Sequence, residues 1–332
     1  MGAAMKQDDA RLSPVASHCL NGQCVEAISV LEELVRNQPA NPELHHQLGM
    51  CYSGACKPHA FVSIRVAVSY FEHALSLIGS CGPFSLRAKY LDSLGNACLQ
   101  DRRPEDAIRH LSEAAELYAT LELRDDWARE QYNLGNAFCE VGESDVPRKW
   151  QFAVEHYLQA LTVRTKERDP VRFAATVQNL GTAYRELPAG DRRSTVRAAI
   201  GCYHCAMRVY QPGSFPAQHA ALHNNLGNAY LCLPGAPDAT RRNIRRALRH
   251  FERALEIRQR DRRPCDYAAT QFNRGRAYTR QAELDPGAGF DEAVRCFREA
   301  EKCFLVCRDS EHAAAARAEL ARLDTALRQK HI

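Results

Sequence analysis

The sequence predicts an all-α protein, a solenoid in which about seven helical hairpins follow one another along the chain. Two interleaved sets of regularly spaced residues indicate two helices per repeat. Six glycines recur 46, 40, 46, 46 and 48 residues apart, at Gly49, Gly95, Gly135, Gly181, Gly227 and Gly275. Seven alanines, each followed four residues later by Leu, Phe or Tyr, form the second set: Ala27, Ala67, Ala107, Ala153, Ala199, Ala247 and Ala293.

The residue types of the two sets predict how the helices pack. Small residues recur at fixed positions where the backbones of neighbouring helices come into contact. We expect the Leu, Phe or Tyr that follows each alanine to fill the space between units. Each unit then buries its apolar face against its neighbours, so that the core grows along the stack without a single globular centre.

Prolines mark the expected starts of the units, because a proline costs little in the first turn of a helix. They are Pro42, Pro83, Pro170, Pro216 and Pro264. We predict one continuous solenoid over residues 1–332, with units near 8–38, 42–79, 84–120, 126–166, 170–211, 216–260 and 266–305. A last helix near 310–329, rich in Ala, Arg and Glu, is expected to cap the stack, and the first unit is degenerate.

Composition places the chain among ordinary soluble proteins. Of the 332 residues, 45% are hydrophobic and 25% are charged, and the net charge is +4. No run approaches the roughly 18 apolar residues of a membrane span, and the first residues lack an apolar signal core. We therefore expect a cytoplasmic, reducing environment. The fourteen cysteines are accordingly expected to be reduced thiols, with Cys98, Cys139, Cys202, Cys232 and Cys296 at repeat positions inside helices.

The repeats resemble a known family. The run Leu134-Gly135-Asn136-Ala137-Phe138, followed by Ala153-Val154, Tyr157 and Ala160-Leu161, resembles the tetratricopeptide repeat. Units of 40 to 48 residues are longer than the minimal repeat of about 34. This longer form resembles the repeats of kinesin light chains, of Leu-Gly-Asn polarity scaffolds and of bacterial proteins in which such repeats precede a caspase-like CHAT protease. The resemblance implies a right-handed superhelix.

The resemblance also implies that the first helix of every unit lines a concave groove that binds an extended peptide. Asparagines recur on these helices, at Asn96, Asn133, Asn136, Asn179, Asn225, Asn228 and Asn273. An amide offers two donors and an acceptor without charge, so a row of asparagines can pair with the backbone of a bound peptide. Further residues expected near the groove are Lys89, Arg129, Tyr132, Glu140 and Arg185. Alternatively, the asparagines bridge neighbouring helices or face solvent.

A basic stripe is expected on one helix of the sixth unit. Its members are Arg242, Arg245, Arg246, Arg249 and Arg253, which share a helix face through their three- and four-residue spacing. Such a stripe could bind phosphates, an anionic membrane or an acidic partner. Since the chain contains 37 arginines and seven lysines, a solvated face is the alternative.

Catalytic and metal-binding signals are weak. Cys51, Cys56 and His59 have a C-x4-C-x2-H spacing that is too loose for a structural zinc site, so we expect ordinary turn residues. Cys202 and Cys205 lie on a helix in which redox use is not expected. There is no Gly-rich phosphate loop, metalloprotease helix or nucleophile elbow in the sequence. We expect no cofactor and no metal.

The sequence therefore predicts a non-catalytic adaptor that binds a protein or peptide partner in its groove. Two alternatives follow from the observations above. The chain could be a regulatory or sensor partner of a CHAT protease system, as the resemblance implies. It could also bind nucleic acid through the basic stripe, although a net charge of +4 and the lack of interleaved aromatic residues make nucleic acid a minor alternative.

Overall fold

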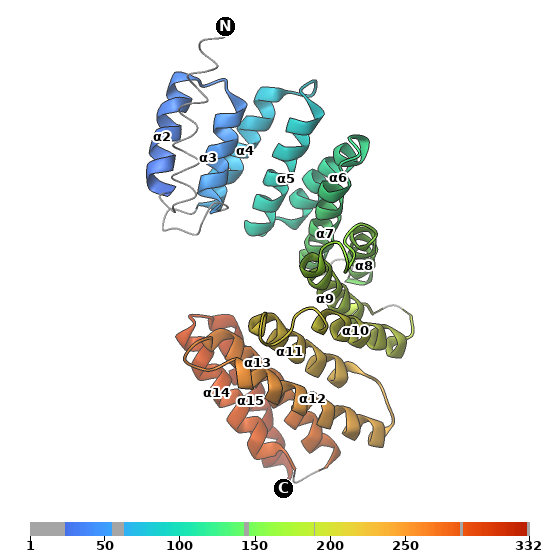
Figure 1. Ribbon diagram of the computed structural model, residues 1–332. Coiled ribbons are helices and arrows are strands. Elements are labelled where there is room, and N and C mark those ends of the chain that lie inside the picture. The colour runs from blue at the N-terminus through green and yellow to red at the C-terminus, as the bar shows by residue number, and fades with distance from the viewer. Residues whose placement is uncertain (1–23, 55–62, 143–145, 189, 286–287, 331–332) are drawn as a thin grey trace. The chain divides into compact units, whose positions relative to one another are not determined.

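The structure is a computed structural model that describes residues 24–54, 63–142, 146–188, 190–285 and 288–330 (Figure 1). These residues form fourteen helices and no strand, which confirms the predicted all-α solenoid. The helices divide into two compact units, Met1–Val163 and Arg164–Ile332. Each unit is described by itself and consists of helical hairpins stacked in chain order.

Unit one contains seven helices. They are α2 (Cys24–Asn37), α3 (Pro42–Tyr52), α4 (Ile64–Ile78), α5 (Phe84–Gln100), α6 (Pro104–Thr120), α7 (Arg124–Glu140) and α8 (Val146–Leu161). The pairs α3/α4, α5/α6 and α7/α8 form hairpins whose helices pack along their length. Of the expected first unit at 8–38, only the second helix, α2, lies within the described residues.

Unit two contains the remaining helices. They are α9 (Pro170–Glu186), α10 (Arg192–Met207), α11 (Pro216–Cys232), α12 (Pro237–Ile257), α13 (Pro264–Leu284), α14 (Phe290–Val306) and α15 (Ser310–Lys330). The hairpins are α9/α10, α11/α12 and α13/α14. The final helix packs on α14 through Ala313, Ala316 and Leu323, which are buried, as expected of a capping helix.

The repeated glycines are in contact with large side chains of the second helix in the same hairpin. A Cβ added to Gly135 would lie 2.5 Å from the Tyr157 ring, and one added to Gly49 would lie 2.5 Å from the Phe71 ring. Such distances are far below van der Waals contact, so only glycine fits. The large residues therefore pack within the hairpin as well as between hairpins, which the sequence did not indicate.

The same large residues also reach the next hairpin. Phe71 belongs to one buried cluster with Leu94 and Cys98 of the following first helix. The repeated alanines of the second helices are fully buried, from Ala67 to Ala293. The rings and alanines thus belong to a series of buried clusters along each unit, so that hairpins are buried against their neighbours, as a stack of repeats requires.

The cysteines differ from expectation at one pair. Cys265 and Cys307 are joined by a disulfide, with their Cα atoms 5.9 Å apart. The prediction of reduced thiols is wrong for this pair, because the start of α13 and the end of α14 meet at the same end of their hairpin. Cys98, Cys139, Cys202, Cys232 and Cys296 are free, and Cys98 and Cys296 are buried as predicted.

The contact between glycine and ring can be tested by substituting Gly227. Its added Cβ would overlap the Phe251 ring, so Gly227→Ala is expected to destabilise unit two by about 1–3 kcal/mol. Gly201, inside α10, is the control because nothing lies within 4 Å of an added Cβ there. Gly201→Ala should be neutral or stabilising by up to about 1 kcal/mol. Urea unfolding of the full chain measures both, and equal midpoints would contradict the packing described.

Candidate functional site

The first helices of consecutive hairpins lie next to each other inside each unit. In unit one α5 contacts α7, and in unit two α11 contacts both α9 and α13. Two positions of each first helix, two and six residues before the repeat glycine, are four residues apart and therefore share a helix face. We call the surface that they form in each unit its first-helix face. This face contains half of the twelve residues predicted to bind a partner, namely Lys89, Arg129, Asn133, Asn179, Asn225 and Asn273.

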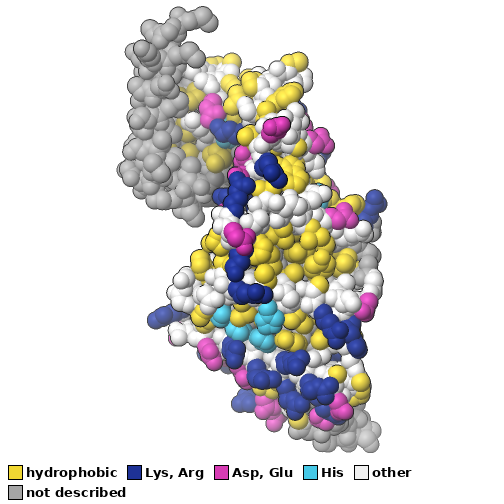
Figure 2. Space-filling view, turned by 45° about the vertical axis from the view of Figure 1, so that its right-hand side comes forward, with side chains coloured by type: hydrophobic (Ala, Val, Ile, Leu, Met, Phe, Trp, Pro, Cys, Tyr) yellow, Lys and Arg dark blue, Asp and Glu magenta, His cyan; other side chains and the backbone are white. Residues whose placement is uncertain are grey.

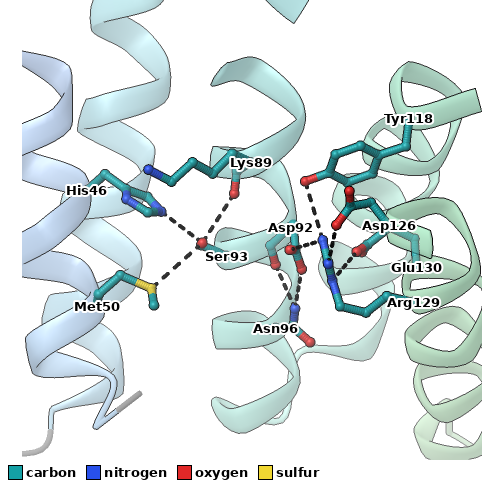
Figure 3. A network of polar contacts seen from close by, with 10 residues as sticks. All are labelled: His46, Met50, Lys89, Asp92, Ser93, Asn96, Tyr118, Asp126, Arg129 and Glu130. Carbon is teal, nitrogen blue, oxygen red and sulfur yellow. Dashed lines mark hydrogen bonds and ion pairs between the residues drawn. The ribbon is translucent and has the colours of Figure 1, made fainter. Parts of the chain in front are cut away.

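In unit one the first-helix face is occupied by charged side chains that pair with one another. The Lys89 ammonium lies 3.0 Å from a carboxylate oxygen of Glu43 on α3, and the Tyr90 hydroxyl donates to the same carboxylate at 3.0 Å. Ser93 is the other α5 residue of this face, and its hydroxyl lies 2.9 Å from Nε2 of His46 on α3 (Figure 3). Helices α3 and α5 are therefore joined by polar contacts along this face.

Arg129 on α7 is the centre of a second network (Figure 3). Its Nη2 lies 2.8 Å from Asp92 on α5, its Nη1 pairs with Asp126, and its Nε lies 3.2 Å from Glu130. The Asn96 amide donates to the Asp92 carboxylate and to the Asp92 backbone carbonyl. The guanidinium thus joins α5 to α7, and the predicted groove residue Asn96 belongs to that junction.

The carboxyl group of Glu130 has an unusual protonation equilibrium. Its side chain is fully buried. Burial, and then the negative charge of Asp92, raise the pKa of Glu130 to about 9, although Arg129 opposes the shift. Burial also raises the pKa of Asp92. At neutral pH Glu130 is therefore protonated, and the network holds Arg129 against Asp92 and Asp126.

The other predicted residues of unit one have different surroundings. Asn136 accepts a hydrogen bond of 2.8 Å from the Tyr157 hydroxyl of α8, and Tyr132 lies with its ring centroid 5.9 Å from that of Tyr157. Asn133 is half-buried and has no polar partner among the described residues, and Glu140 is exposed at the end of α7. Asn133 and Glu140 thus remain available to a partner, whereas Asn136 ties α7 to α8.

In unit two the first-helix face carries no charge at the same two positions. Alanine stands six residues before each repeat glycine and asparagine two residues before it, as the pairs Ala175 and Asn179, Ala221 and Asn225, and Ala269 and Asn273. All six side chains are half-buried. The Asn273 amide donates to Asn224 at 3.1 Å, which links α13 to α11.

The remaining residues of unit two lie at the borders of this face. Asn225 and Asn228 have no polar partner within the described part of the chain, and both are half-buried on α11. Arg185 pairs with Glu186 at 2.7 Å and has only 18% of its side chain exposed. Its guanidinium interacts with Tyr203 of α10, so it lies toward the second helix of its own hairpin.

The five arginines of the basic stripe are exposed on α12. No carboxylate forms an ion pair with any of its five arginines in the part of the chain that the structure describes. Arg241, on the same helix, contrasts with them because it pairs with Asp238 at 3.1 Å and Asp285 at 3.3 Å. Figure 2 shows arginine and lysine side chains gathered beside a group of histidines on this face.

Metal-binding residues are not gathered in the described structure. Cys51 is buried, whereas Cys56 and His59 of the loose C-x4-C-x2-H spacing lie outside the described residues. No group of three or more His, Cys, Asp or Glu side chains could hold a metal ion among the residues with described positions. His223 is buried, and its Nδ1 lies 2.9 Å from Nδ1 of His250.

Sequence reasoning missed the acidic partners in unit one, namely Glu43, Asp92 and Glu130. A search of the repeat register for ionisable residues at buried positions could have found Glu130, which is five residues before its glycine. Sequence reasoning also missed Tyr230 and His250, which lie beside the basic stripe. No spacing rule connects these two residues, since they belong to different helices.

No protein-family model and no curated protein matches the chain. Solved structures do resemble it. Cut9 in the APC/C hetero-tetramer Cut9–Hcn1 matches with TM-score 0.57 and 16% identity over 93% of this chain and 48% of that chain. The apo form of RapI matches with TM-score 0.56 and 14% identity over 87% and 99% of the two chains.

A third solved structure is the C-terminal part of a TPR repeat-containing protein from Cytophaga hutchinsonii, with TM-score 0.53 and 13% identity over 92% of this chain and 98% of that chain. At these identities the likeness concerns the fold. The chain has the tetratricopeptide-repeat fold, as the sequence predicted. Among the described helices, none is long and apolar enough to cross a membrane.

The buried carboxyl of Glu130 predicts a pH dependence of stability. Its pKa is raised from 4.5 in the unfolded chain to about 9 in the fold, so the folded state keeps a proton that the unfolded state loses. Stability is therefore highest below pH 4.5 for this group and falls as the pH rises toward 9. Glu130→Gln, which keeps a neutral side chain, is expected to reduce that fall.

The measurement is the urea unfolding midpoint between pH 5 and pH 9 for the wild type and Glu130→Gln. Glu140→Gln, at an exposed position of the same helix, is the control and should follow the wild type. If Glu130→Gln and the wild type lost stability in parallel over this range, the carboxyl of Glu130 would not be protonated in the fold.

Proposed function

We propose that the chain is a non-catalytic adaptor that binds a segment of another protein on the first-helix face of unit two. The observation that carries this proposal is the repetition of an alanine and an asparagine, four residues apart, on α9, α11 and α13. The alanine side chains are short, and the asparagine four residues after each of them offers uncharged donors and an acceptor.

The chemistry of this face suits the backbone of a partner better than charged side chains. An asparagine amide has two N–H donors and one acceptor oxygen, so Asn273 keeps one N–H and its oxygen for a bound segment beside its bond to Asn224. Because the face carries no charge at these positions, it would tolerate different side-chain sequences. The extended surface itself is a consequence of stacking hairpins, and such surfaces are the usual binding sites of repeat proteins.

The first-helix face of unit one is less suited to this role. Lys89 and Arg129, which the sequence placed near the groove, are paired with Glu43 and Asp92. A partner would have to break these ion pairs or bind over them. We propose that Lys89 and Arg129 mainly hold neighbouring hairpins together, and that Asn133 and Glu140 are peripheral to the binding face.

The structural comparisons support this proposal at the level of the fold. One solved structure is a Rap protein complexed with Competence and Sporulation Factor, which matches with TM-score 0.52 and 13% identity over 91% of this chain and 80% of that chain. Cut9 was solved in a hetero-tetramer with Hcn1. The fold of this chain thus occurs in proteins that were captured with partners.

The test uses peptides selected from a random peptide library displayed on phage, with the full chain as bait. Selected peptides are then measured by fluorescence anisotropy against the triple variant Asn179→Ala, Asn225→Ala and Asn273→Ala. Losing three hydrogen-bonding amides is expected to weaken binding at least about tenfold. Asn133→Ala, at the matching position of unit one, is the control and should bind like the wild type.

Circular dichroism separates lost binding from lost structure, because the asparagines are half-buried and the helices should persist. Undiminished affinity of the triple variant would remove the asparagines of unit two from the binding face. A stronger loss for Asn133→Ala than for the triple variant would move the binding face to unit one.

A further inference from the structure

A cleft in unit two is lined by positively charged side chains that form no ion pair with a carboxylate of the described residues. It lies between α11 and α12, has a volume of about 220 Å³, and is lined by Tyr230, Arg246, Arg249, His250 and Arg253. Its position coincides with the exposed basic stripe, on the second helix of the hairpin rather than on the first-helix face. It is therefore a surface separate from the first-helix face that the proposed function concerns.

The three arginines of the cleft have no anionic partner among the described residues. Arg249 donates from Nε only to the backbone carbonyl of Arg245, at 3.4 Å, and the Arg246 guanidinium lies 5.6 Å from the centroid of the Tyr230 ring. Three guanidinium groups around one opening repel each other unless an anion lies between them. The cleft thus has the charge pattern of an anion-binding site.

The wall of the cleft is held in place by ring contacts. The His250 ring stacks on Tyr230, with centroids 5.5 Å apart and planes 16° from parallel. Its Nδ1 lies 2.9 Å from Nδ1 of the buried His223. The nitrogen left to face the cleft is therefore Nε2, which can donate a hydrogen bond when Nδ1 accepts from His223.

The protonation state of His250 is also suited to an anion-binding cleft. Burial, together with His204 on α10 and with Arg253 and Arg249 on α12, lowers the pKa of His250 to about 4. The imidazole is neutral near pH 7, and it adds a hydrogen-bond donor without adding to the repulsion among the arginines. A bound anion would stabilise all of these groups at once.

We propose that this cleft binds a phosphate monoester carried by an acidic segment of a partner protein. A phosphate monoester has a charge of about −1.5 to −2 at pH 7 and three terminal oxygens. It can therefore accept from three guanidinium groups, whereas a carboxylate has one charge and two oxygens. The planar fork of arginine matches phosphate oxygens in pairs, which favours this ligand over a diffuse ionic attraction.

The surroundings of the cleft favour a protein segment over a membrane or a nucleic acid. None of the exposed large hydrophobic side chains in the described structure lies on α11 or α12, so nothing there would insert into lipid. The Tyr230 ring already contacts Arg246 and His250, so it is not free to stack on a base. Arg242 and Arg245 extend the stripe beyond the cleft, where acidic residues flanking the phosphate would bind.

The test compares two fluorescein-labelled peptides, Asp-Glu-phosphoserine-Glu-Asp and the same sequence with serine, binding to the full chain in 150 mM salt. Phosphorylation is expected to tighten binding at least about tenfold. The double variant Arg249→Ala and Arg253→Ala should abolish that difference. Arg197→Ala, at an exposed position on α10 outside the cleft, is the control and should retain it.

The variant Arg249→Lys distinguishes the geometry of the guanidinium from its charge. Lysine keeps the positive charge but lacks the planar pair of N–H donors. The variant should lose most of the preference for phosphoserine. Competition by phenyl phosphate tests the phosphate monoester without any peptide, and it should displace the phosphopeptide. All of these side chains are exposed, so unchanged circular dichroism is expected for each variant.

The proposal would be overturned by equal affinity for the two peptides, or by full phosphoserine preference in the double variant. Tighter binding of a 20-nucleotide oligothymidine than of the phosphopeptide would replace it with nucleic-acid binding. Tighter binding to vesicles of phosphatidylcholine with 20% phosphatidylserine would replace it with membrane binding.

Discussion

The contact between a glycine of the first helix and a large side chain of the second helix determines how each hairpin packs. In five hairpins the partner is an aromatic ring, and in the hairpin of α5 and α6 it is Leu111. Because the glycine must face the second helix, the positions two and six residues before it must face elsewhere. The same constraint that packs the core therefore decides which residues a partner can reach.

The two units use this shared geometry for different chemistry. In unit one the outward positions hold Glu43, Lys89 and Arg129, and these side chains are used in contacts between consecutive first helices. In unit two the same positions hold alanines, and adjacent first helices are joined by the neutral contact of Asn273 with Asn224. A repeat register thus conserves packing while leaving the polar surface free to differ.

Sequence periodicity predicted the helices well because it records packing. The glycines and alanines recur where backbones are crowded, and prolines such as Pro170 and Pro264 stand in the first turns of helices.

The partners of Lys89 and Arg129 were not predictable in the same way. Whether Arg129 reaches Asp92 depends on the rotation of α7 against α5 by a fraction of a turn, which spacing along one helix does not determine. The disulfide of Cys265 with Cys307 likewise depends on how two helix ends meet.

The cleft beside the basic stripe was predictable from the sequence only in part. The spacing of the arginines predicted their common face, whereas Tyr230 and His250 come into the cleft only through the pairing of α11 with α12. The spacing could not show which arginines lack a carboxylate partner, because this depends on where the carboxylates near α12 lie in the fold. Among the residues with described positions, Arg241 has such partners and the five arginines of the stripe have none.

The turn between paired helices tolerates changes in its length, whereas the helices themselves do not. Gly95 and Leu111 are 16 residues apart, whereas Gly227 and Phe251 are 24 apart, yet both pairs make the same contact. Residues have therefore been added or removed at the hairpin tips without disturbing the core. The tip at 233–236 is accordingly a natural insertion point for a fluorescent reporter or an affinity handle, since lengthening it leaves the helix register unchanged.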